Sequence, residues 1–121
     1  MTTPETIVDR YFAIWNEADG GKRRALIAST WSDGATYVDP LMAVEGADAI
    51  DAAVAKVQAM LPGYRFVARG KIDSHNDRLR FAWELVGPDG AAPYAGTDFA
   101  VLGADGRLAA VTGFLDRVPP Q

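Results

Sequence analysis

The sequence predicts an α+β domain in which helices cover one face of a mainly antiparallel sheet. Two observations support this fold class. In the first half of the chain, apolar residues recur at helical spacing in segments that end at glycine or proline. In the second half, apolar and polar residues alternate between regularly spaced turn sequences, which is typical of consecutive antiparallel strands. Helices separated from the strands in this way indicate an α+β arrangement.

The first helix is expected to begin at Thr3-Pro4. The threonine hydroxyl can accept a hydrogen bond from an unpaired backbone amide of the first turn, and proline is tolerated there. Gly20-Gly21 is expected to break the helix. Apolar residues at helical spacing form one wide face that must be buried: Ile7, Val8, Tyr11, Phe12 and Trp15.

Two more helices and one strand are expected before the second half of the chain. A second helix is predicted over residues 22–31. Residues 35–39 alternate as a strand that ends at Pro40, because proline cannot donate to a sheet ladder. A third helix follows Gly46, carries a buried apolar stripe and ends at Pro62-Gly63.

Four strands with one solvated face are predicted in the second half. Apolar residues alternate with charged ones along them, and glycine, proline, asparagine and aspartate mark the turns. The expected strands are residues 64–73, 78–85, 94–102 and 107–116.

Composition narrows the possible function classes. The 121 residues are enough for one ordinary domain, and we expect residues 1–121 to form a single domain. The absence of cysteine excludes disulfides and thiolate chemistry, and we expect a cytoplasmic protein. A net charge of −4 disfavours nucleic acid as a partner. We expect neither a secretory signal nor a membrane-spanning segment.

Four polar side chains interrupt otherwise apolar surfaces. Tyr11 lies on the buried face of the first helix, and Asp98 interrupts the apolar strand 96–102. Tyr37 and Asp39 share one face of the first strand, because side chains alternate with a period of two. A buried carboxylate is costly unless it is paired, hydrogen-bonded or neutralised, so these positions are candidates for a functional site.

Several segments resemble ketosteroid isomerases and their SnoaL-like relatives in the NTF2-like superfamily. The matching segments are residues 10–12 with Asn16, residues 35–40 followed by Gly46 and Ile50, and residues 97–99. The resemblance spans nearly the whole chain. It implies a cystatin-like cone, in which three N-terminal helices pack on a curved, mainly antiparallel sheet around a small-molecule pocket.

The resemblance also implies catalytic roles. Asp39 falls on the family's general base, Tyr11 on its oxyanion-hole tyrosine, and Asp98 on its protonated, hydrogen-bond-donating aspartic acid. In such chemistry a carboxylate removes a proton next to a carbonyl group, while two OH donors stabilise the enolate oxygen. The implied activity is cofactor-independent acid/base catalysis on an apolar carbonyl compound, either ketosteroid isomerase-like or polyketide cyclase-like.

Each of these residues also has a structural interpretation. Tyr11 can fill the core and donate to a neighbouring carbonyl. Asp39 can stabilise the turn at Pro40, and Asp98 can pair with an arginine. The corresponding alternative for the whole protein is a non-catalytic ligand-binding or dimerisation module. The charged pattern of the related epoxide hydrolases is not present in residues 78–87, so their reaction is not expected.

The large side chains are expected to divide between core and pocket. His75 is interpreted as a solvated turn residue, and no metal site is expected. No organic cofactor is expected either, because the sequence has no glycine-rich phosphate loop and no lysine placed for a Schiff base. The expected partners are an apolar small molecule and, by resemblance, a second copy in a homodimer. The ligand-binding candidates are Trp15, Trp31, Tyr37, Met42, Trp83 and Phe114.

Overall fold

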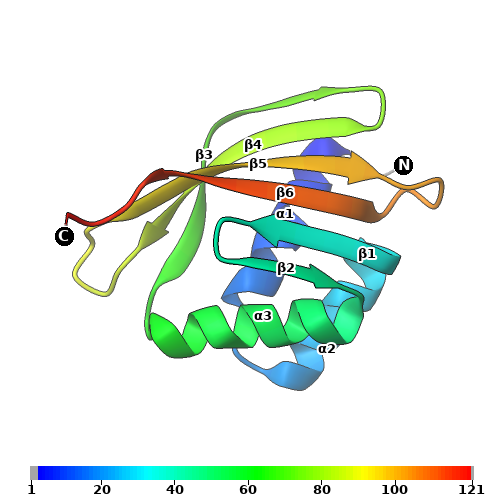
Figure 1. Ribbon diagram of the computed structural model, residues 1–121. Helices are drawn as coiled ribbons and strands as arrows, with labels where there is room; N and C mark the ends of the chain where they lie inside the picture. The colour runs from blue at the N-terminus through cyan, green and yellow to red at the C-terminus, as the bar shows by residue number, and fades with distance from the viewer. Residues whose placement is uncertain (1–2, 121) are drawn as a thin grey trace.

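The computed structural model describes residues 3–120, in which three helices precede or interleave with six strands (Figure 1). None of these helices is long and apolar enough to cross a membrane. The elements in chain order are α1 (Pro4–Asn16), α2 (Gly20–Thr30), β1 (Trp31–Asp39), β2 (Met42–Glu45), α3 (Ala47–Met60), β3 (Arg65–His75), β4 (Arg78–Val86), β5 (Tyr94–Leu102) and β6 (Leu108–Arg117).

The strands form one sheet in the order β2-β1-β6-β5-β4-β3. β1 and β6 run parallel, and the other neighbouring pairs are antiparallel. Figure 1 shows the three helices together on one side of this sheet. The expected arrangement of three helices on a mainly antiparallel sheet is confirmed.

Irregular pairing bends the long strands. The register between β3 and β4 shifts between Arg69 and Asp73, where Gly70 has a φ of +68°. The register between β5 and β6 shifts between Ala95 and Gly96. Such irregularities bend a strand and increase its twist. The sheet therefore curves around the helices rather than lying flat (Figure 1).

A buried polar network fixes the end of α1 against the other two helices. The Gln58 Nε2 group donates to the carbonyl oxygens of Trp15 and Glu17, each at 2.9 Å. Arg23 donates to the same Glu17 carbonyl at 2.8 Å and to Asp51 Oδ1 at 2.6 Å. Because the last carbonyls of a helix have no partner inside it, these donors satisfy groups that would otherwise be unpaired.

The boundaries of α2 and β1 differ from those predicted. α2 begins at Gly20, because the Asp19 side chain caps it by accepting a hydrogen bond from the Lys22 amide at 2.9 Å. α2 ends at Thr30, and Trp31, predicted to lie in the helix, is the first residue of β1. The sequence does not predict β2, because its four residues are too few to show a clear alternation.

Aromatic rings fill the space between the helices and the sheet. The Tyr11 ring is the centre of this group and is 2% exposed. Its centroid lies between 5.2 and 6.4 Å from the rings of Phe12, Trp15, Trp31 and Phe81. Tilted and edge-on contacts of this kind stabilise a core beyond the area they bury.

Candidate active site

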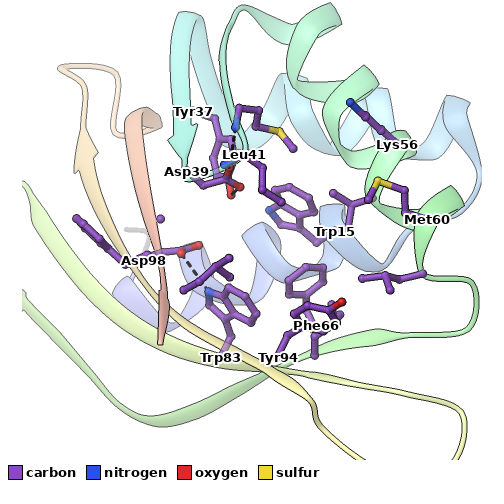
Figure 2. Close-up of a pocket in the computed structure, with 17 residues that line it drawn as sticks. Trp15, Tyr37, Asp39, Leu41, Lys56, Met60, Phe66, Trp83, Tyr94 and Asp98 are labelled. Atoms are coloured by element: carbon purple, nitrogen blue, oxygen red, sulfur yellow. Dashed lines mark hydrogen bonds between the residues drawn. The ribbon is translucent and has the colours of Figure 1, made fainter. Parts of the chain in front are cut away.

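A pocket of about 340 Å³ lies between α3 and the inner face of the sheet (Figure 2). This volume is near the lower end of the range of about 300–1,000 Å³ that is usual for small-molecule sites. Three charged side chains reach the wall: Asp39, Lys56 and Asp98. The rest of the wall is mainly apolar and includes Trp15, Met42, Met60, Phe66, Trp83 and Tyr94.

Asp98 is the most deeply buried carboxyl group of the wall, with 3% of its surface exposed. Its Oδ2 atom accepts a hydrogen bond from the Tyr11 hydroxyl at 2.6 Å, and its Oδ1 atom accepts one from Trp83 Nε1 at 3.0 Å. Burial raises the pKa of Asp98 to about 6, although both hydrogen bonds act in the opposite direction. The group can therefore gain and lose a proton near neutral pH.

Tyr11 lies behind Asp98 and is not part of the pocket wall. Its hydroxyl donates to the Asp98 carboxyl group, so that hydrogen is not directed at the pocket. Burial, followed by the nearby charge of Asp98, raises the pKa of Tyr11 well above its usual value. The tyrosine therefore keeps its proton and positions Asp98.

Asp39 stabilises the turn after β1 and also lines the pocket. Its Oδ1 atom accepts hydrogen bonds from the backbone amides of Leu41 at 2.8 Å and Met42 at 3.0 Å. Its Oδ2 atom accepts one from the Tyr37 hydroxyl at 2.7 Å. Burial and the charge of Asp98 raise the pKa of Tyr37, so that hydroxyl remains a donor. The turn after β1 thus holds the Asp39 carboxylate in a fixed orientation.

Gly113 separates the two carboxylates on the floor of the pocket. It lies on β6, paired with Asp98 on β5, while β1 with Asp39 lies on the other side of β6. A Cβ atom at this position would lie 2.9 Å from Asp98 Oδ1, 3.4 Å from Asp39 Cβ and 3.4 Å from the Tyr37 hydroxyl oxygen. A side chain here would crowd the Asp98 carboxyl group, so the glycine allows Asp98 and Asp39 to lie close together on the pocket wall.

A second glycine fixes the orientation of Trp83. Gly96 on β5 is paired with Trp83 on β4, and a Cβ atom on it would lie 2.7 Å from Trp83 Cε2. The indole ring therefore packs directly over the glycine backbone. This contact holds the ring where its Nε1 group donates to Asp98 (Figure 2).

The end of α1 positions the edge strand β3 beside the pocket. The Asn16 side chain donates to the Phe66 carbonyl at 2.9 Å and accepts from the Phe66 amide at 2.8 Å. The Phe66 ring then lies with its centroid 5.2 Å from that of Trp15. This paired contact explains the presence of a polar residue at position 16.

The structure brings most of the predicted site residues to the pocket. Trp15, Tyr37, Asp39, Met42, Trp83, Asp98 and Phe114 reach its wall. Phe114 is nevertheless 58% exposed. Trp31 is 3% exposed, is not on the wall, and packs against Tyr11 in the core.

Sequence reasoning missed part of the wall. Phe66 and Tyr94 fall on the apolar face of their strands, so the alternation pattern could have suggested them. Lys56 and Gly113 gave no sequence signal, because each depends on which elements meet at the pocket. Within residues 3–120, no three histidine, aspartate or glutamate side chains are grouped to hold a metal ion.

Comparisons with known proteins place these observations in context. Residues 8–111 match the SnoaL-like domain family. The chain also resembles the crystal structure of a candidate isomerase of the SnoaL-like family from Agrobacterium tumefaciens str. C58, with 44% sequence identity and a TM-score of 0.92. This match covers 96% of the chain and 99% of the relative. A search among curated proteins finds no match.

More distant solved structures share the fold. An NTF2-like protein of unknown function from Exiguobacterium sp. 255-15 is 29% identical, with a TM-score of 0.69 over 92% of the chain and 98% of that protein. A candidate SnoaL-like polyketide cyclase from Jannaschia sp. CCS1 is 20% identical, with a TM-score of 0.71 over 96% of the chain and 90% of that protein. The expected NTF2-like fold is confirmed.

Proposed function

The chain belongs to the SnoaL-like domain family, and from this membership and the geometry of its pocket we propose that it is a cofactor-independent acid/base enzyme. Its substrate would be a small, largely apolar carbonyl compound. The observation that carries the proposal is Asp98, a carboxyl group that is 3% exposed, lines the pocket beside Gly113 and is held by Tyr11 and Trp83. Burial raises its pKa to about 6. The isomerase and cyclase descriptions of the structural relatives suggest the same reaction types.

The proposed reaction divides the chemistry between the two carboxyl groups. Asp39 removes a proton from the carbon next to the carbonyl, and protonated Asp98 donates its proton to the carbonyl oxygen above Gly113. The product of this step is an enol, with Asp39 protonated and Asp98 ionised. Return of the Asp39 proton to a different carbon, with transfer of the enol proton back to Asp98, completes an isomerisation. Attack of the enol carbon on a second carbonyl group of the same molecule would instead give a cyclisation. The enol proton then returns to Asp98, and the new alkoxide oxygen takes the proton from Asp39.

Tyr11 takes a different role from the one that the resemblance implies. Because its hydroxyl donates to Asp98 Oδ2, we assign it as a positioning residue, while Asp98 itself contacts the substrate oxygen. The Trp83 Nε1 group has the same function for Oδ1. The remaining position on Oδ1, next to Gly113, would carry the proton that Asp98 donates.

Exchange of carbon-bound protons tests this proposal without knowledge of the natural substrate. We expect the protein to catalyse deuterium uptake by small apolar ketones such as cyclohexanone in D2O, followed by NMR. Exchange should fall as pH rises through about 6, because only protonated Asp98 can donate. Asp39→Asn and Asp98→Asn should abolish exchange, while Asp77→Asn in an exposed turn should not. Exchange that survives both pocket changes would contradict the proposal.

A non-catalytic ligand-binding protein is the second candidate. The observation in its favour is that both oxygens of Asp39 already accept hydrogen bonds, which limits their capacity to act as a base. In that case small ketones would bind to the pocket, and binding would depend on Gly113 having no side chain. No exchange above the buffer rate would be detected at any pH.

We also propose that the outer face of the sheet forms a homodimer. Val38 and Phe99, which are 41% and 40% exposed, both neighbour Thr112 on this face of adjacent strands. Sedimentation should show a dimer for the unmodified chain and a monomer for Phe99→Glu. A monomer at micromolar concentration for the unmodified chain would exclude this assembly.

A further inference from the structure

We propose that Lys56 binds an anionic group of the ligand at the edge of the pocket, so that the substrate is a small apolar carbonyl compound carrying a carboxylate. The carbonyl part of this inference rests on the proposed function. The carboxylate part rests on the position and surroundings of one lysine, and can be tested separately.

Lys56 is the only cationic side chain among the described residues that line the pocket. It takes part in none of the ion pairs formed within residues 3–120. Its own helix offers no acidic partner, because the residues three and four positions away are Ala52, Ala53, Ala59 and Met60. Within the part of the chain that the structure describes, the ammonium group therefore forms no ion pair.

The surroundings of this lysine are apolar on the pocket side. Leu41, Met60 and Leu61 line the same pocket as Lys56, and Leu41 and Met60 are 73% and 62% exposed. Large apolar side chains exposed around a pocket are typical of a binding surface rather than of an ordinary solvated face. A ligand that buries them against its own apolar part would bring its end close to Lys56.

The charges of the pocket are separated in space. Figure 2 shows Lys56 and Met60 extending from α3 on one side, while Asp39 and Asp98 lie on the opposite side. A carboxylate near the acids would be repelled, and a carboxylate near Lys56 would be attracted. The arrangement selects one orientation, with the anion at α3 and the carbonyl group at Gly113.

The net negative charge of the chain means that a carboxylate ligand needs a local cation such as Lys56 to bind. At −4 the protein repels anions in general, so affinity for a carboxylate requires a local positive group. A cavity of about 340 Å³ limits the ligand to a small molecule. A compact keto acid meets both requirements.

The test compares ligands that differ in charge but hardly in shape. We would titrate the protein with 4-phenylbutyrate and 4-phenylbutyramide at low ionic strength and follow binding by NMR. The unmodified chain should bind the carboxylate about two- to fivefold more tightly than the amide, as expected for one exposed ion pair. Lys56→Gln should remove this preference, and a high salt concentration should reduce it.

Lys22→Gln is the matched control, because Lys22 is an exposed lysine of α2 outside the pocket. It changes the net charge by the same amount and should keep the preference for the carboxylate. Both lysines lie on helices and glutamine is an equally good helix former, so we expect both variants to fold. A melting curve for each variant checks this directly.

The possible outcomes separate this inference from the proposed function. An equal preference in the unmodified chain and Lys56→Gln overturns it, as does failure of the carboxylate to bind at millimolar concentration. A preference lost in Lys56→Gln alone supports it, whether or not proton exchange depends on Asp98. If exchange depends on Asp98 and the carboxylate preference is absent, the enzyme acts on neutral ketones and the anion site is refuted.

Discussion

Replacing Asp98 with asparagine should change how the stability of the protein depends on pH. The pKa of this carboxyl group rises from its ordinary 3.8 to about 6 on folding, mainly because of burial. At pH values between about 3.8 and about 6, Asp98 in the folded protein keeps a proton that the unfolded chain has released. The free energy of unfolding therefore falls as pH rises through this range. The stabilising contribution is complete below about pH 3.8 and lost above about pH 6.

The size of the effect follows from the same two values. One pKa unit corresponds to about 1.4 kcal/mol, so the ionised Asp98 should cost about 3 kcal/mol of stability above pH 6. Asparagine cannot ionise and does not have this cost. It accepts through one oxygen, so Tyr11 or Trp83 loses its partner, but that loss is the same at every pH.

Urea denaturation of both proteins between pH 4 and pH 8 measures the difference. Relative to the unmodified chain, Asp98→Asn should gain about 2–3 kcal/mol in free energy of unfolding as pH rises across this range. Other carboxyl groups titrate in both proteins and largely cancel. Both proteins are measured at one fixed concentration, so that the concentration dependence of any dimerisation is the same in each. A difference that stays constant with pH would refute the assignment of Asp98 as a buried group with a raised pKa.

Three further changes test separate parts of the structure. Gly113→Ala should reduce ketone binding at least tenfold in an NMR titration, because its methyl group would lie 2.9 Å from Asp98 Oδ1. Thermal melting of this variant should show a stability loss of no more than about 3 kcal/mol. Tyr11→Phe removes a hydrogen bond that lowers the pKa of Asp98, so the pH midpoint of proton exchange should move upward; a midpoint that moves downward would contradict this. Asp51→Asn leaves Arg23 buried without its partner and should lower the free energy of unfolding, measured in urea, by about 3–5 kcal/mol. Arg24→Gln removes an exposed partner of the same aspartate and should lower it by less than about 1 kcal/mol.

Periodicity was sufficient to predict the three helices and the four strands of the second half. Alternation over eight or more residues leaves little ambiguity, as in β4, where Leu79, Phe81 and Trp83 face inward. The junction at Trp31 could not be placed, because no glycine or proline marks the change from helix to strand. Local sequence patterns also could not predict the parallel pairing of β1 with β6, because the two strands are far apart in the chain.

The candidate site was only partly predictable. Asp39 and Asp98 stand out in sequence because a carboxylate interrupts an apolar strand. The position of Tyr11 behind Asp98 could not be foreseen, because residues on a buried helix face give no information about which of them reach a cavity. Lys56 resembles any lysine on a helix surface until α3 is placed against the sheet.

The parallel pairing of β1 with β6 has a consequence for the order in which the protein matures. Trp31 meets Leu108 and Tyr37 meets Val111, so β1 finds this neighbour only after nearly all of the intervening chain has been synthesised. A nascent chain on the ribosome that stops short of β6 would hold Asp39 and Asp98 on strands with nothing between them. The proposed acid/base chemistry would therefore require β6, and a prematurely terminated product lacking β6 should not catalyse proton exchange.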